Sequence, residues 1–210
     1  IRQYHESRNR LFLFDYDGTL TPIVSLPHLA VMDRKTGDIL SDIISDPGNK
    51  VIIISGRNRE FMDEQFKDLN AVLIAEHGYF IKHPGEEWSH NVEVDLSWKE
   101  KILPVLNDHV DRCSGSMVED KYASLVWHYR NTDEETASIR INELKDDLTE
   151  IMKNEPKLKV LEGNKVLEIK SILYDKGTIA GSIIQSSKYD FILAMGDDIT
   201  DEDLFRAIPD

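Results

Sequence analysis

Four short apolar runs lie along the chain: LFLF (11–14), VIIIS (51–55), AVLIAE (71–76) and FILAMG (191–196). Each run is continuous rather than alternating, and each is too short to form a buried helix. This pattern is typical of β-strands that are covered on both faces. The sequence therefore predicts four buried strands.

Helical patterns separate the first three of these strands. Apolar residues recur at helical spacing over 33–48, after a candidate cap at Asp33, and a second helix is predicted over 58–69. Strands that alternate with helices indicate an α/β fold built on a doubly wound parallel sheet. Such sheets bind their ligands at the carboxyl ends of the strands.

The middle of the chain has a different pattern. A helix is predicted over 97–113, a hairpin over 117–130, a second helix over 134–154 and a second hairpin over 158–170. A helix followed by two strands, occurring twice, is typical of a small α+β domain whose helices cover one face of an antiparallel sheet. We therefore expect an α+β cap domain at 92–172, inserted into a core domain of 1–91 and 173–210.

Composition narrows the classes of partner. The 210 residues carry a net charge of −14, which disfavours nucleic acid and anionic membrane as partners. Cys113 is the only cysteine, so the chain forms no internal disulfide, and a reducing compartment such as the cytoplasm is expected. Neither a signal peptide nor a membrane span is indicated.

We also expect a fragment of a larger protein, with the C-terminal part of the core domain missing. The first residue is not Met, and the last follows Pro209 in a pattern that reads as a continuing helix.

Polar clusters follow the predicted core strands. Asp15 and Asp17 come after the first strand, Ser55-Gly56-Arg57 after the second, and Gly196-Asp197-Asp198 after the last, while Asp175-Lys176-Gly177 precedes the last strand. The topology brings all four clusters to one edge of the sheet. Carboxylates from the first and last strands can share a small hard cation, for which Mg²⁺ is the natural candidate.

This set of residues suits phosphoryl transfer. Asp15 can attack phosphorus as a carboxylate nucleophile, and Asp17 can protonate the leaving oxygen and later activate water. Lys176 and Ser55, with Gly56 beside it, can hold the phosphate oxygens.

Plainer interpretations exist for each cluster. Asp-x-Asp-Gly is common in simple turns, Ser55-Gly56-Arg57 can be a strand-to-helix connection, and Asp175 can be a helix cap with Lys176 solvated beside it. Asp201, Glu202 and Asp203 are interpreted as first-turn acids, with Thr200 and Asp203 resembling a capping box.

The predicted cap sheet has one polar face. Glu119 and Lys121 are two residues apart, as are His128 and Arg130, and Glu168 alternates with apolar neighbours. These side chains can bind the hydroxyls of a sugar, or they can form cross-strand ion pairs on a solvated face.

The motifs DYDGTL, SGR, DKG and GDDITDED occur in the order found in phosphatases of the haloacid dehalogenase superfamily. Longer segments resemble trehalose-6-phosphate phosphatases of the fungal type: LFLFDYDGTLTPI, VIIISGRNREFMDEQF, AEHGYFIKHPGEEW, SLVWHYRNTD and AMGDDITDEDLF. The resemblance implies a Rossmann-like, haloacid dehalogenase-like core and hydrolysis of trehalose 6-phosphate to trehalose and phosphate.

The resemblance also implies roles for individual residues. Mg²⁺ is bound through Asp15, the main-chain carbonyl of Asp17, and Asp197. The positions that bind the sugar are Glu119, Lys121, Arg130 and Glu168. Two features depart from the family: Asp175 stands where Asn is usual, and Lys170-Ser171 stands where an Arg-Pro pair is usual.

Two alternatives share these motifs. One is a phosphatase for sucrose 6-phosphate or another sugar phosphate. The other is a non-catalytic domain that binds sugar phosphate within a larger trehalose synthesis protein or complex. The presence of Asp17 argues against the second, because a binding module has no need of an acid–base group.

Overall fold

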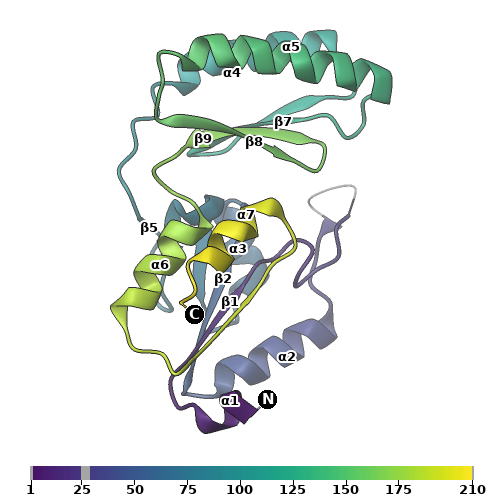
Figure 1. Cartoon of the computed structure of the whole chain (residues 1–210). Helices are drawn as coiled ribbons and strands as arrows, with labels where there is room; N and C mark the ends of the chain where they lie inside the picture. Colours follow the sequence, from purple (N-terminus) through teal and green to yellow (C-terminus); the bar gives the residue numbers. More distant parts are fainter. Residues whose placement is uncertain (1, 25–28, 210) are drawn as a thin grey trace. The chain divides into compact units, whose positions relative to one another are not determined.

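The computed structural model describes residues 2–24 and 29–209, which form two compact units (Figure 1). The first unit contains the residues up to Val92 and those from Tyr174 onward, and the second contains Glu93–Leu173. Among the residues that the structure describes, no helix combines the length and apolarity that a membrane crossing requires.

A mixed six-stranded sheet forms the centre of the first unit, in the order β10-β1-β2-β3-β4-β5. The four predicted strands are parallel, namely β1 (Arg10–Phe14), β2 (Asn49–Ile54), β3 (Val72–Ala75) and β10 (Phe191–Met195). The predicted α/β class is confirmed. Two short antiparallel strands, β4 (Phe80–Lys82) and β5 (Ser89–His90), extend the sheet and were not expected, because segments this short carry little periodicity.

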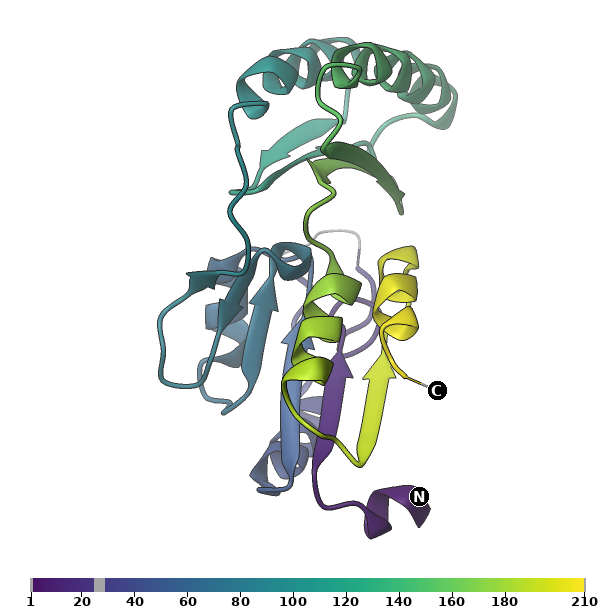
Figure 2. The same cartoon turned by 60° about the vertical axis from the view of Figure 1, so that its left-hand side comes forward.

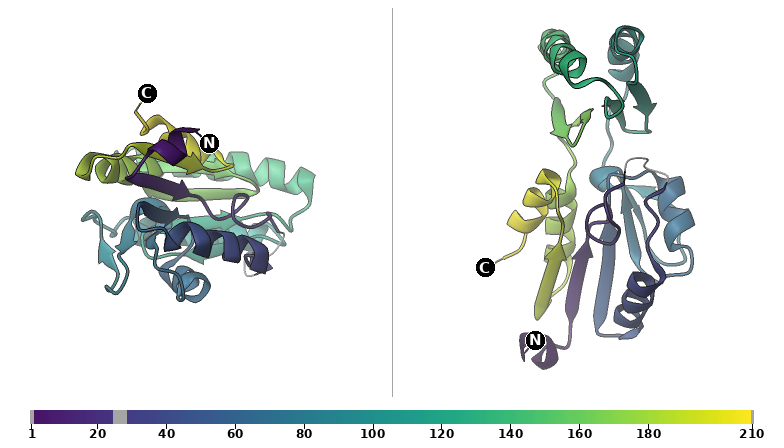
Figure 3. Two further views of the ribbon diagram at one scale, coloured as in Figure 1. Left: turned by 90° about the horizontal axis from the view of Figure 1, so that it is seen from below. Right: turned by 90° about the vertical axis from the view of Figure 1, so that its right-hand side faces the viewer.

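Helices cover both faces of this sheet (Figures 2 and 3). On one face α6 (Lys176–Ser186) and α7 (Ile199–Arg206) pack against alternate residues of β1 and β2, among them Leu13 and Ile52. The other face carries α2 (Arg34–Ser45) and α3 (Arg59–Phe66), while the short α1 (Arg2–Glu6) precedes β1. Burial on both faces explains why the strand sequences are continuously apolar.

One predicted helix end agrees with the structure and another does not. Asp33 caps α2, since its carboxylate accepts a hydrogen bond from the amide of Thr36 at 2.8 Å. The sequence pattern also predicted a helix that continues past Pro209. This prediction is wrong, because α7 ends at Arg206.

The second unit is a four-stranded antiparallel sheet with two helices on one face (Figure 1). Its helices are α4 (Lys99–Arg112) and α5 (Glu134–Met152). The strands, in the order β6-β7-β9-β8, are Met117–Asp120, Ser124–His128, Val166–Ser171 and Leu158–Gly163. Trp127 and Ile169 pack with Leu106 of α4 and Leu144 of α5 in one apolar cluster. Strand residues that alternate with this cluster therefore lie on the other sheet face.

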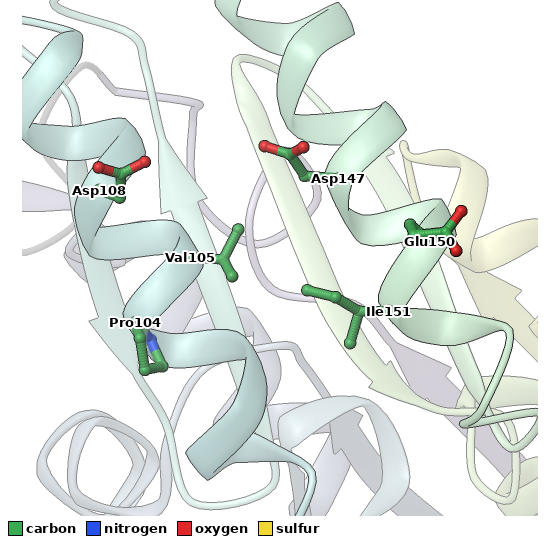
Figure 4. A pocket seen from close by; sticks show the side chains of 6 residues that line it. All are labelled: Pro104, Val105, Asp108, Asp147, Glu150 and Ile151. Carbon is green, nitrogen blue, oxygen red and sulfur yellow. The ribbon is translucent and has the colours of Figure 1, made fainter.

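An open pocket of about 450 Å³ lies between α4 and α5 (Figure 4). Its lining residues are Pro104, Val105, Asp108, Asp147, Glu150 and Ile151. None of them is a site residue predicted from the sequence. The pocket is on the helical side of the sheet, so it does not belong to the polar face that carries Glu119 and Glu168.

Candidate active site

Three carboxylates meet at the carboxyl ends of β1 and β10. Ligand oxygens of Asp15, Asp197 and Asp201 all lie within 4.8 Å of one another. Asp15 follows β1 directly, and its amide donates to the carbonyl of Met195 at 2.9 Å, which ties the two strand ends together. Gly18 has φ +85°, and a Cβ there would lie 1.9 Å from Oδ2 of Asp197. The Asp-Gly turn is thus shaped to admit the carboxylate of Asp197.

Lys176 is buried beside two of these acids. Its Nζ donates to Oδ1 of Asp15 at 2.5 Å and to Oδ1 of Asp201 at 2.8 Å. Asp175 caps α6 by accepting a hydrogen bond from the amide of Thr178 at 2.7 Å. The interpretation of Asp175 as a cap is correct, but Lys176 is not a solvated first-turn residue. The helix cap at Asp175 begins α6 so that Lys176, in its first turn, extends into the acidic cluster.

The charges of this cluster are strongly coupled. Burial alone would lower the pKa of the Lys176 ammonium, but Asp15 and Asp201 together raise it, so the side chain remains charged. Burial raises the pKa of Asp15 from 3.8 to about 6, although Lys176 opposes this effect. Partial burial and the charges of Asp198 and Asp201 also raise the pKa of Asp197. The acidic cluster therefore favours the binding of a further positive charge, either a proton or a cation.

Asp201 stabilises the acidic cluster through hydrogen bonds to its neighbours. Its carboxylate is fully buried; Oδ1 accepts from Lys176, and Oδ2 accepts from the amides of Asp197 and Asp198 at 3.2 and 3.1 Å. Asp198 and Asp201 form the capping box of α7, so the expected box of Thr200 and Asp203 is wrong. Our sequence interpretation missed the role of Asp201. A start of α7 at Ile199 would have revealed it, since that start puts Asp201 in the capping position.

The carboxylate of Asp17 is outside the acidic cluster and pairs with Arg57. The Nε of Arg57 donates to Oδ2 of Asp17 at 2.7 Å, and a terminal nitrogen donates to Oδ1 at 2.5 Å. The guanidinium lies over the ring of Phe61, 4.4 Å from its centroid. The pair places Asp17 near the loop that follows β2. Arg57 received no role from the sequence, because nothing in the pattern links it to a residue 40 positions earlier.

The loop Ser55-Gly56-Arg57 is tightly packed at the end of β2. Ser55 is buried, and its Oγ accepts from the amide of Arg57 at 3.2 Å. A Cβ on Gly56 would lie 2.4 Å from Nε2 of His77, which belongs to the short helix η2 (Glu76–Gly78). The loop therefore approaches the imidazole more closely than any residue with a side chain would permit.

The polar residues predicted for the sugar lie in the second unit. Glu119 of β6 and Glu168 of β9 both pair with Val126 of β7, so the two acids share one face of the sheet. Lys121 lies just beyond β6, and its charge helps to lower the pKa of Glu119. The structure thus brings these three side chains into one neighbourhood.

The sequence pattern placed Arg130 on the same strand face as His128, but the structure does not. Strand β7 ends at His128, and the guanidinium of Arg130 donates to the carbonyl of Asn164 at 2.8 Å in the β8–β9 hairpin. The alternation in the sequence does not reveal where a strand ends, which explains the error.

The cluster fits a small divalent cation. The Asp15 and Asp197 carboxylates are oxygen donors from two adjacent strand ends, and within the described ranges the Asp197 carboxylate makes no hydrogen bond or ion pair with protein. Both oxygens of Asp201 already accept hydrogen bonds. The donor set therefore favours Asp15 and Asp197 as ligands, with Asp201 supporting them.

Comparison with known proteins decides the family. The family model described as trehalose-phosphatase matches residues 13–210. The chain belongs to the trehalose-phosphatase family. It is 37% identical over 212 residues to the trehalose-phosphatase of Schizosaccharomyces pombe, covering 98% of this chain and 26% of that protein. It is 40% identical over 206 residues to the bifunctional trehalose-6-phosphate synthase/phosphatase of Thermoproteus tenax, covering 98% and 28%.

Solved structures agree with this family assignment. The C-terminal domain of C. albicans trehalose-6-phosphate phosphatase matches with a TM-score of 0.92 and 36% identity, covering 98% of this chain and 76% of that one. A haloacid dehalogenase-like hydrolase from B. subtilis, at 15% identity and a TM-score of 0.63, shares the fold; the match covers 94% of this chain and 86% of that one. The chain spans about a quarter of the length of the Schizosaccharomyces pombe and Thermoproteus tenax proteins.

Proposed function

We propose that this chain is a phosphatase domain that hydrolyses trehalose 6-phosphate to trehalose and phosphate. The observation that carries the proposal is the buried ion pair of Lys176 and Asp15, beside Asp197, in a member of the trehalose-phosphatase family. A lysine and a carboxylate at the end of a buried strand suit a nucleophile that must carry a transferred phosphoryl group.

Asp15 and Asp17 divide the chemistry. An oxygen of Asp15 attacks phosphorus, the bond from phosphorus to the sugar oxygen breaks, and Asp17 gives its proton to that oxygen. Asp17 then takes a proton from a water molecule, which attacks the aspartyl phosphate. This second step frees phosphate and restores the Asp15 carboxylate. The position of Asp17 outside the acidic cluster supports a role in proton transfer, separate from that of Asp15.

The phosphate oxygens are held by Lys176, Ser55 and the loop at Gly56. Lys176 supplies a permanent positive charge, which the raised pKa of its ammonium supports. Asp15, Asp197 and the main-chain carbonyl of Asp17 would hold Mg²⁺. When bound, Mg²⁺ neutralises charge that develops on the phosphoryl oxygens. This charge is needed, because the chain is strongly acidic.

The second unit acts as the cap that selects the sugar. Glu119, Lys121 and Glu168 accept from or donate to hydroxyl groups of trehalose, and Arg130 contributes after its side chain leaves the carbonyl of Asn164. Their shared face of the sheet supports this role for the two acids. The domain works in the cytoplasm as part of a larger trehalose synthesis protein, a context that the bifunctional Thermoproteus tenax relative supports.

The deciding experiment measures phosphate release from trehalose 6-phosphate, sucrose 6-phosphate and glucose 6-phosphate, each with Mg²⁺ and with a chelator. We expect release that requires Mg²⁺ and is fastest for trehalose 6-phosphate. Preference for sucrose 6-phosphate would assign a different substrate. Binding of trehalose 6-phosphate without turnover of any substrate would indicate a regulatory domain instead.

A further inference from the structure

We propose that His128 is a positioning residue for Glu119 and thereby part of the device that recognises the sugar. The inference rests on the proposed function, and it assigns a specific role to a side chain that the sequence placed only in general terms among the polar residues of the sheet face. The Nε2 atom of His128 lies 2.8 Å from Oε2 of Glu119. Both side chains are partly buried, with 22% and 37% of their surface exposed.

Strand register fixes this contact. His128 pairs with Met117 of β6, and Glu119 is two residues further along β6, opposite Val126. Residues two apart on a strand share a face, so His128 and Glu119 are diagonal neighbours across β6 and β7. A diagonal of this kind is within reach of long side chains. The contact follows from the backbone pairing rather than from a chance rotamer.

Glu119 needs such a partner because burial disfavours its negative charge, and a second acid adds a smaller repulsion. Glu168 pairs with the same residue of β7 from the opposite side, and its negative charge acts on Glu119. Burial and Glu168 both raise the pKa of Glu119, yet the hydrogen bond from His128 and the charges of Lys121 and His128 lower it overall. His128 therefore helps to keep Glu119 ionised beside a second carboxylate.

The contact also sets the direction of the carboxylate. A carboxylate only accepts hydrogen bonds, so Nε2 must carry the hydrogen in this pair. A carboxylate has lone pairs for about four such bonds, which leaves capacity for a sugar hydroxyl. A side chain held in one rotamer binds that hydroxyl with less loss of entropy than a free one. Removal of His128 should thus weaken sugar binding by Glu119 and leave the residues that act on the phosphate unchanged.

The test is a double-mutant cycle with His128→Ala, Glu119→Ala and the combined variant, assayed on trehalose 6-phosphate and on p-nitrophenyl phosphate. We expect His128→Ala to lower kcat/KM for trehalose 6-phosphate about 10-fold and to leave the aryl phosphate within about twofold. In the Glu119→Ala background, His128→Ala should have no further effect. His128→Asn, which retains a donor amide, should recover part of the loss. His83→Ala, an exposed histidine of the first unit, is the matched control.

The possible results separate the role of His128 from the phosphatase assignment. Additive losses in the cycle, or equal losses on both substrates, would overturn the positioning role and leave the phosphatase assignment standing. Full activity of His128→Ala would do the same. A wild-type chain that releases phosphate from the aryl substrate but not from trehalose 6-phosphate would overturn both the sugar assignment and this role. Thermal unfolding of every variant, measured by circular dichroism, detects a general loss of fold.

Discussion

The ammonium of Lys176 lies 2.5 Å from Oδ1 of Asp15, although 161 residues separate the two positions in the chain. Both side chains are almost completely buried. A charged pair in this environment is favourable only when its partners are in place, because each charge has lost its water. The acidic cluster of the first unit is therefore complete only when α6 has packed beside β1. The whole second unit lies between these two elements in the sequence.

Replacement of Lys176 tests whether the buried carboxylates depend on its positive charge. We expect Lys176→Met to abolish turnover and to lower the free energy of unfolding by about 3 to 5 kcal/mol, because Asp15 and Asp201 would remain buried without their counter-charge. Urea unfolding without Mg²⁺ measures the loss. Lys145→Met is the control, since Lys145 pairs with Glu162 at a partly exposed site and should cost about 1 kcal/mol or less. Similar costs for the two variants would contradict the assigned burial of the pair.

Asp15→Asn tests the nucleophile. The amide keeps the shape of the side chain but cannot attack phosphorus, so turnover should fall below detection. Folding and much of the substrate binding should survive, which circular dichroism and calorimetric titration with trehalose 6-phosphate would report. A near-normal rate would remove Asp15 from the mechanism.

The pKa of Asp15 leads to a prediction about pH and metal. Burial raises this pKa from 3.8 to about 6 without a metal ion. Between about pH 4 and about pH 6 the folded chain therefore holds more protons at this group than the unfolded chain, so the contribution of Asp15 to stability falls as the pH rises through that range. Mg²⁺ must replace this proton, so its stabilising effect should grow with pH.

A melting experiment measures this linkage. With Mg²⁺ at about 100 times its Kd, we expect an increase in Tm of roughly 5 to 10 °C near pH 7.5 and a much smaller one near pH 5. Asp197→Asn should abolish most of the increase, whereas Glu202→Gln, at an exposed acid of α7, should retain it. An increase that does not depend on pH would show that the cation binds away from Asp15.

Much of this arrangement could be predicted from the sequence. Continuous apolar runs identify buried parallel strands, and the acids that follow LFLF and FILAMG must then lie at one sheet edge. The pairing of Asp17 with Arg57 could not be predicted, because it depends on side-chain directions of two different loops. Arg130 was misplaced since alternation does not mark a strand end. Asp201 was hidden by its second role as a capping residue of α7.

Arg57 provides a prediction about proton transfer. Its two hydrogen bonds orient the Asp17 carboxylate, and lysine cannot reproduce that planar fork. We expect Arg57→Lys to lower kcat about 10- to 100-fold for trehalose 6-phosphate and much less for p-nitrophenyl phosphate, whose leaving group needs little protonation. Arg59→Lys, at an arginine that lies over the ring of Phe80, is the control. Equal losses on both substrates would instead indicate that Arg57 supports the phosphate loop.

The proposed sugar specificity is tested most directly at Glu168, which shares the polar face with Glu119 and lies far along the chain from Asp15 and Asp17. Under the proposed function Glu168 binds a part of the substrate remote from phosphorus. Binding energy from such a part can be used to align the reacting group, so its loss lowers catalysis as well as affinity. We expect Glu168→Ala to lower kcat/KM for trehalose 6-phosphate by about 10- to 1000-fold, equivalent to roughly 1.4 to 4 kcal/mol. Hydrolysis of p-nitrophenyl phosphate should change little, because that substrate has no sugar to bind. Glu162→Ala, at an acid of the neighbouring strand that pairs with Lys145 of α5, should be neutral on both substrates. Losses on both substrates would make Glu168 a structural residue, and no loss on either would move the sugar site elsewhere.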